Sequence, residues 1–185
     1  MKGLFSVALE MQEFLGRAGD RFCFIGGVAL QRWGQPRLTQ DVDLTLLCAP
    51  GEEATAIDRL LVKFAGRLPD ARDFALRNRV LLLRSESGVG IDVSLGAIPF
   101  EQRCVGRASE FDFGAGFRLL TCSAEDLIVL KAFASRPQDW IDIEAVVVRQ
   151  RLTLNWKQVF DELEPLVALR ETPETIDRLR QLHNG

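Results

Sequence analysis

The sequence predicts an α+β fold, with a mixed β-sheet and helices in the first two thirds of the chain and only helices after it. Short apolar runs alternate with stretches of helical spacing up to residue 120. Residues 41–47 and 89–95 alternate polar and apolar side chains, as strands with one buried face do. We therefore expect a core over residues 1–120 and a helical region over 121–185, packed on it as one compact unit.

The elements of the predicted core follow from their periodicity. Apolar residues recur at helical spacing in residues 4–18, 28–33 and 52–64. Strand-like patterns occupy residues 22–25, 41–47, 74–77, 80–84 and 89–95. We expect residues 74–77 and 80–84 to form a hairpin, and residues 98–121 to contribute only short strand-like pieces at 104–105 and 117–120. The result is a sheet with helices on one side.

Capping residues define the helices of the last third. Ser123 is expected to cap a helix over residues 124–134, and Asn155 one over residues 156–169. Pro137 suits the first turn of a helix that continues over residues 138–149. Thr172 and the proline after it can begin a last helix, which ends near residue 182.

Composition excludes several classes of function. The chain has 185 residues, 47% of them hydrophobic, and a formal charge of -3, so no general attraction to nucleic acid or anionic membrane is expected. Its four cysteines form no C-x-x-C pair and indicate buried thiols, and the single histidine, His183, lies near the C-terminus. Without a signal peptide or an apolar run of about 20 residues, the sequence predicts a cytoplasmic protein with no membrane partner.

Three carboxylates lie on the polar faces of predicted strands. Asp41 and Asp43 share one side of a strand, and Asp92 is on another strand that could lie beside it. Such a cluster repels itself unless a counter-charge is present. Oxygen ligands without a nearby His or Cys favour Mg²⁺ or Mn²⁺, which takes further ligands from substrate phosphates. The pattern therefore indicates nucleotide chemistry.

A Gly26-Gly27 pair stands where a predicted strand meets a helix. Glycines allow an anion to approach the backbone closely, and the N–H groups of a helix N-terminus can bind phosphate. Taken alone, a Gly-Gly turn is more often simple turn chemistry, and an isolated D-x-D motif is also common. Their combination is much more specific than either part.

These motifs resemble a known superfamily. Residues 24–29, 37–44 and 91–93 look like the Gly-Gly, D-x-D and hydrophobic-Asp-hydrophobic signature of the DNA polymerase β-like nucleotidyltransferases. The R-x-T-x-D-x-D form is most similar to the minimal and AbiEii-like branch, some of whose members are toxins of bacterial toxin-antitoxin systems. Residues 126–131 and 136–143 are similar to that branch's helical lysine and R-x-x-D-x-x-D-I segment. Where the superfamily often has serine after its first glycine, this chain has Gly27.

The resemblance implies transfer of NMP from an NTP to a hydroxyl acceptor, with release of pyrophosphate. It assigns catalysis and Mg²⁺ or Mn²⁺ binding to three aspartates and nucleotide binding to six further residues. The catalytic and metal-binding residues would be Asp41, Asp43 and Asp92. The nucleotide-binding residues would be Gly26, Gly27, Arg37, Thr39, Lys131 and Asp139. Alternative interpretations are a solvated Lys131, helix capping by Asp139 and Asp142 with a salt bridge to Arg136, and a structural role for Arg37 and Thr39.

Three functions remain open from the sequence. The first is a toxin-like transferase acting on tRNA or protein, with an antitoxin as a further partner. The second modifies a small hydroxylated molecule such as an antibiotic, and the third is an inactive nucleotide-binding or partner-binding module. Five arginines between residues 67 and 84 could favour RNA, or could form a solvated face paired with acidic residues. These arginines are Arg67, Arg72, Arg77, Arg79 and Arg84.

Overall fold

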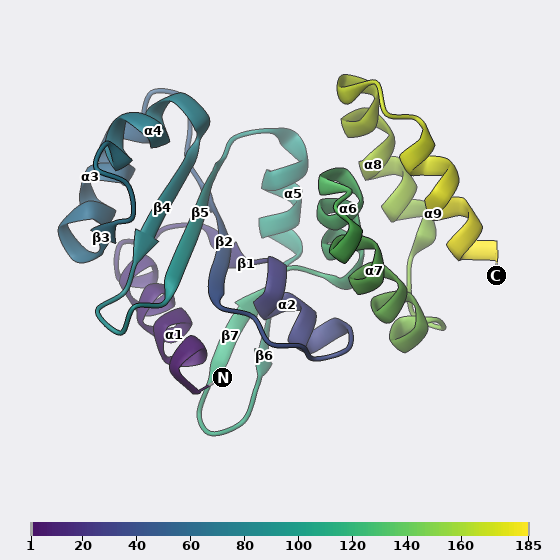
Figure 1. Ribbon diagram of the computed structural model, residues 1–185, viewed down its shortest axis with the longest axis horizontal. Coiled ribbons are helices and arrows are strands. Elements are labelled where there is room, and N and C mark those ends of the chain that lie inside the picture. The colour runs from purple at the N-terminus through teal and green to yellow at the C-terminus, as the bar shows by residue number, and fades with distance from the viewer. Residues whose placement is uncertain (1, 185) are drawn as a thin grey trace. The chain divides into compact units, whose positions relative to one another are not determined.

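The computed structural model describes residues 2–184, which divide into two compact units (Figure 1). The first comprises the residues up to Val28 together with Leu38–Cys122, and the second comprises Ala29–Arg37 together with the residues from Ser123 on. The break after Cys122 lies close to the predicted boundary, whereas the segment 29–37 was not expected to belong with the C-terminal helices. That the two parts form one compact unit stays a prediction.

The first unit contains a mixed β-sheet, which confirms the predicted fold class. Its strands run in the spatial order β3-β4-β5-β2-β1-β7-β6. Strand β2 is parallel to β5 and β1 is parallel to β7, while the other neighbours are antiparallel. The strands are β1 (Phe22–Phe24), β2 (Asp41–Leu47), β3 (Ala65–Gly66), β4 (Val80–Arg84), β5 (Gly90–Gly96), β6 (Ser109–Asp112) and β7 (Arg118–Thr121).

Helices of the first unit lie against both faces of this sheet. Apolar side chains of β2 and β5 form one buried core with helix α1, to which Met11 and Leu15 contribute. On β1, Cys23 alternates with the core residues Phe22 and Phe24, and its Sγ lies 4.0 Å from that of Cys104 in helix α5. The prediction of helices on one side is therefore wrong, because α5 covers part of the opposite face. The helices are α1 (Lys2–Arg17), α3 (Glu53–Lys63), α4 (Ala71–Asn78) and α5 (Pro99–Arg107).

Two expected strands are helices, and the two edge strands, β3 and β6, were not foreseen. Residues 74–77 belong to α4, which buries only the small side chains of Ala71 and Ala75 and so has a weak apolar pattern. Residues 104–105 lie in α5, where Pro99 occupies the first turn and the Glu101 carboxylate accepts hydrogen bonds from the N–H groups before it. Strand β6 is an exposed edge strand without apolar alternation. All four cysteines are buried thiols outside any disulfide, as expected.

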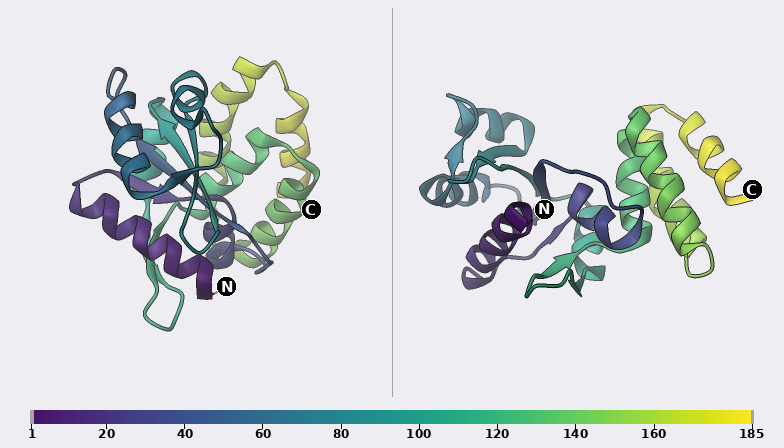
Figure 2. Two further views of the ribbon diagram at one scale, coloured as in Figure 1. Left: turned by 60° about the vertical axis from the view of Figure 1, so that its left-hand side comes forward. Right: turned by 60° about the horizontal axis from the view of Figure 1, so that its bottom comes forward.

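The second unit is helical (Figure 2). The first turn of α2 (Gly26–Trp33) belongs to the first unit, and the rest of that helix belongs to the second. The remaining helices are α6 (Ala124–Ala134), α7 (Pro137–Gln150), α8 (Trp156–Arg170) and α9 (Glu174–Asn184). Ser123 and Asn155 cap α6 and α8, as predicted, by accepting hydrogen bonds from the N–H groups of Asp126 and Gln158. Within residues 2–184, no helix combines the length and apolar character that crossing a membrane requires.

Replacing the cap of α6 should destabilise the protein. In Ser123→Ala, the Asp126 N–H loses its side-chain acceptor at the start of a buried helix, at a cost of about 1 kcal/mol. Ser123→Thr keeps the hydroxyl and is the matched control. Urea unfolding followed by circular dichroism measures both, and equal stability of the two variants would contradict the assigned cap.

Candidate active site

The polar face of the sheet brings the three predicted aspartates together. In the parallel pairing of β2 with β5, Asp43 lies opposite Asp92 and Asp41 lies opposite Gly90. The apolar neighbours Val42 and Leu44 point into the core, so the carboxylates lie on the opposite face. All three aspartates are only partly buried. Two adjacent strands therefore carry three neighbouring carboxylates on the face of the sheet that lies away from the core.

Arg67 supplies the positive charge beside these carboxylates. It lies between β3 and α4, and its backbone N–H donates to the carbonyl of Leu82 in β4, 2.9 Å away. Its Nη2 donates a short hydrogen bond to Oδ1 of Asp92, while its Nη1 lies 3.8 Å from Oδ1 of Asp41. One guanidinium thus bridges the two strands. Sequence reasoning missed this role and left Arg67 among the arginines of a surface segment.

The glycine pair stands at the N-terminus of α2, next to Asp43. The helix begins at Gly26 itself, two residues earlier than expected, and Gly26 has a left-handed backbone with φ of +53°. The Gly27 N–H donates to Oδ2 of Asp43 at 3.4 Å. A Cβ on Gly26 would lie 2.7 Å from the carboxyl carbon of Asp43, and one on Gly27 would lie 2.7 Å from Cβ of Thr39. Both glycines therefore make room for predicted site residues.

Gly90 clears the corresponding space beside Asp41. A Cβ at this position would overlap the Asp41 carboxylate and approach Nη1 of Arg67 to 3.0 Å. Gly90 was not predicted, although a signal existed, since it precedes Asp92 by two residues and shares its face of the strand. The missing side chain is what allows the carboxylate and the guanidinium to meet there.

The surroundings of Asp92 raise its pKa above the ordinary aspartate value. Burial is the largest influence and raises the pKa of Asp92, and the charge of Asp41 acts in the same direction. The guanidinium of Arg67 opposes both but does not outweigh them. A carboxylate whose pKa is raised is a better proton acceptor than an ordinary aspartate.

The donor chemistry of this face suits a divalent cation. It offers carboxylate oxygens, and the absence of a side chain at Gly26 and at Gly90 leaves room beside them. As the side chains stand, no group of three or more His, Cys, Asp or Glu within residues 2–184 is arranged to hold a metal ion. Arg67 instead takes the place of the counter-charge. The residues fit Mg²⁺ or Mn²⁺ in type, and Arg67 contacts oxygens of two of the carboxylates that would ligate the ion.

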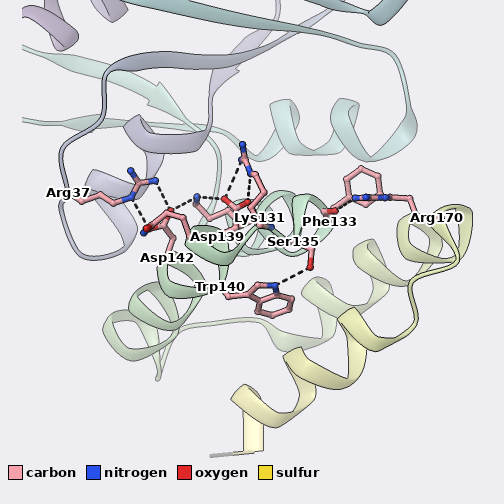
Figure 3. Close-up of polar contacts among 10 residues, drawn as sticks. Arg37, Lys131, Phe133, Ser135, Asp139, Trp140, Asp142 and Arg170 are labelled. Carbon is pink, nitrogen blue, oxygen red and sulfur yellow. Dashed lines mark hydrogen bonds and ion pairs between the residues drawn. The ribbon is translucent and has the colours of Figure 1, made fainter.

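Three of the other predicted site residues, Arg37, Lys131 and Asp139, belong to an ion-pair network in the second unit (Figure 3). Lys131 of α6 is 6% exposed, and its Nζ donates to Asp139 at 3.1 Å and to Asp142 at 2.6 Å. Arg37 donates two hydrogen bonds to Asp142, each of 2.9 Å. Arg136 donates to Asp139 through both its backbone N–H and its guanidinium. Both carboxylates are almost completely buried.

The pKa values of these two aspartates reflect strong pairing. Burial by itself would raise the pKa of Asp139, but hydrogen bonds from Arg136 and Lys131 and the charge of Lys131 lower it below the ordinary value. Burial would likewise raise the pKa of Asp142, and hydrogen bonds from Arg37, Lys131 and Gln138 lower it instead. Both groups therefore stay ionised at neutral pH.

These contacts distinguish between some of the interpretations that the sequence left open for Lys131 and Asp139. A solvated Lys131 is wrong, because its ammonium is buried between two carboxylates. The salt bridge of Asp139 to Arg136 and its cap of the helix start are confirmed. Arg37 has a structural contact to Asp142, and Thr39 donates to the Asp41 carbonyl at 3.4 Å. Nucleotide contacts by Arg37, Thr39, Lys131 and Asp139 stay predictions.

Most arginines of the segment 67–84 have carboxylate partners. Arg72 pairs with Asp58 at 2.6 Å, and Arg77 pairs with Asp70 at 3.1 Å. Arg79 pairs with Glu53 and donates to the carbonyls of Cys48 and Leu95. Arg72 and Arg77 are thus paired with acidic residues, as one of the two interpretations of this segment expects. Arg79 instead links α3 to the backbone of residues 48 and 95 in the first unit.

The family follows from a comparison with protein-family models. Residues 11–182 match the model described as the nucleotidyl transferase AbiEii toxin of type IV toxin-antitoxin systems. The chain belongs to this family. It is thus a nucleotidyltransferase by family and fold, as its motifs implied. No curated protein gives a significant match.

Solved structures share the fold at low sequence identity. ANT(2'')-Ia, bound to adenylyl-2''-tobramycin, is 16% identical with a TM-score of 0.58, over 90% of this chain and 98% of that one. An antigenic nucleotidyltransferase-like protein from Paracoccidioides brasiliensis is 17% identical with a TM-score of 0.54, over 92% and 90%. Lincomycin-bound LnuA, a lincosamide antibiotic adenylyltransferase, is 12% identical with a TM-score of 0.50, over 75% and 92%. These likenesses support the fold of the AbiEii-family chain.

Adding a methyl group at Gly26 should disturb both the helix start and Asp43. Gly26→Ala forces an L-residue into a left-handed backbone and pushes a Cβ into the Asp43 carboxylate, so we expect a loss of about 2 kcal/mol in stability. Gly16→Ala in α1, where a Cβ meets nothing within 4 Å, should leave stability unchanged or slightly higher. Thermal unfolding compares the two, and equal effects would contradict this account of Gly26.

Removing the charge of Lys131 should make the protein acid-sensitive. In Lys131→Met two buried carboxylates lose a partner, so we expect a loss of about 2 to 3 kcal/mol at neutral pH. In the wild type, the lowered pKa values of Asp139 and Asp142 give stability that is present above the unfolded carboxyl pKa and lost as pH falls through the folded values. The variant raises those folded values, so its acid unfolding should begin at higher pH.

The control is Lys157→Met, which removes an exposed lysine paired with Asp161. Urea unfolding between pH 7 and pH 3 should show little change for this variant. The same acid profile for both variants would show that the Lys131 network does not set the pH dependence.

Proposed function

We propose that this AbiEii-family protein transfers NMP from an NTP to a hydroxyl acceptor in a reaction that depends on Mg²⁺ or Mn²⁺. The observation that carries the proposal is the register of β2 and β5, which sets Asp41, Asp43 and Asp92 on one face beside the glycine N-terminus of α2. Three carboxylates next to the N–H groups of a helix start are suited to a triphosphate and its cation. Family membership supports nucleotidyl transfer in general.

The three aspartates would hold the cation, which supplies charge neutralisation for the triphosphate and lowers the pKa of the acceptor hydroxyl. The N–H groups at the start of α2 would bind the β- and γ-phosphates, with Gly26 and Gly27 leaving the backbone open to them. Asp92 would accept the hydroxyl proton at a carboxylate oxygen. The hydroxyl oxygen then bonds to the α-phosphorus as the bond to the leaving pyrophosphate breaks.

A toxin-type acceptor is our first expectation. The family description names a toxin of a toxin-antitoxin system, so we propose a macromolecular acceptor, tRNA or protein, and an antitoxin partner. ANT(2'')-Ia and LnuA are described in complex with an adenylylated antibiotic and an antibiotic. A small hydroxylated acceptor is therefore our second candidate. Cytoplasmic location stays a prediction.

Neutralising one carboxylate should abolish transfer while the fold survives. Asp92→Asn and Asp41→Asn remove a cation ligand, and Asp92→Asn also removes the proposed proton acceptor, so we expect transfer to fall by about 10²-fold or more. Asp58→Asn, which alters an exposed pair with Arg72, is the matched control and should retain activity. Transfer is measured with α-³²P-labelled NTPs and Mg²⁺ in the presence of cellular RNA, cellular protein or an aminoglycoside.

The fraction that carries the label identifies the acceptor class. Label on RNA or protein supports the toxin-type acceptor, and label on the aminoglycoside supports the second candidate. Unchanged transfer by Asp92→Asn would refute the proposed site, and no label with any acceptor would support the inactive binding module.

A further inference from the structure

The contacts of Arg67 differ from those of an ordinary structural ion pair. Its guanidinium serves two carboxylates, with a short hydrogen bond to Asp92 and a long contact of 3.8 Å to Asp41. Its Nε is buried, and it has no hydrogen-bond partner among the described residues. The side chain remains 22% exposed, and that of Asp41 is 48% exposed. Arg67 is thus attracted to the site, although the site does not satisfy all of its donors.

Electrostatics explains why a cation is needed at this point. Asp41 and Asp92 raise each other's energy when both are ionised, and burial adds to the cost for Asp92. Arg67 relieves this repulsion with a single positive charge. A divalent cation bound to the same oxygens would relieve the repulsion with two positive charges. The cation and the guanidinium therefore compete for the same carboxylates.

A released Arg67 has a clear alternative partner. Its backbone is fixed to β4 through Leu82, so the guanidinium stays near the site after it leaves Asp92. A triphosphate brings several negative oxygens to that position, and guanidinium binds phosphate in the two-pronged manner in which it binds carboxylate. The arginine can therefore exchange one anion for another without being withdrawn into solvent.

We propose that Arg67 is an exchangeable counter-ion of the carboxylate site. It holds Asp41 and Asp92 while no divalent cation is bound, yields them to the cation, and then pairs with the phosphate chain of the nucleotide. The proposal rests on the proposed function, because it assumes that these carboxylates bind a cation and a nucleotide. It predicts that Arg67 opposes binding of the metal alone and supports binding of the nucleotide.

The test separates these two effects with Arg67→Gln. Binding of Mn²⁺ alone, followed by electron paramagnetic resonance, should become roughly threefold to tenfold tighter, because a competing charge of a partly exposed ion pair is gone. At saturating Mn²⁺, calorimetry with α,β-methylene-ATP should show weaker nucleotide binding by a similar factor. Arg67→Lys keeps the charge but not the two-pronged geometry, and it should restore the competition with Mn²⁺ more than the nucleotide contact.

The controls keep the two proposals distinguishable. Arg72→Gln, which removes an arginine of an exposed pair, should change neither affinity. Asp92→Asn should weaken Mn²⁺ binding, and circular dichroism checks that each variant is folded. If the wild type binds Mn²⁺ and folded Arg67→Gln binds it equally or more weakly, or if nucleotide affinity is unchanged, the counter-ion proposal is wrong while the proposed function stands. If neither protein binds Mn²⁺, the proposed function fails and the counter-ion proposal fails with it.

Discussion

The parallel register of β2 against β5 is the constraint on which the rest of the candidate site depends. It places Asp43 opposite Asp92 and Asp41 opposite Gly90, all on the face away from the core. A slip of one residue would turn the carboxylates of one strand into the core and its apolar residues outward, at a large cost in burial. The apolar faces of the two strands therefore fix the geometry of the polar faces, so packing on one side of the sheet sets the chemistry on the other.

Much of this arrangement could be predicted because a strand has a period of two. Alternation in residues 41–47 and 89–95 defines both faces of both strands, and the D-x-D spacing places two carboxylates on one of them. Ser123 and Asn155 could be predicted as caps because their hydrogen bonds are local. The fold class, the shared face of Asp41 and Asp43 and these two caps needed no knowledge of long-range contacts, whereas the place of Asp92 beside them depends on the pairing of β2 with β5.

The parts that could not be predicted depend on tertiary contacts or on weak periodicity. Helix α4 buries only Ala71 and Ala75, so its short apolar run does not distinguish helix from strand. Arg67 was missed because its role depends on a backbone hydrogen bond to Leu82 and on an open space at Gly90. Neither is visible in the spacing of the residues. In the sequence, Arg67 resembles the other arginines of an exposed segment, and only the folded sheet places it next to Asp92.

The two ion clusters of the chain differ in how readily they can exchange partners. Lys131 is almost completely buried, and each of its two carboxylates also pairs with an arginine, so these contacts form a closed network in a poorly solvated place. Arg67 is partly exposed, has one short and one long contact, and leaves Asp41 accessible to water. Water and incoming ions can therefore replace the Arg67 contacts at a modest cost. The proposed exchange of ligands therefore concerns the sheet cluster, whereas the Lys131 contacts join α6 to α7.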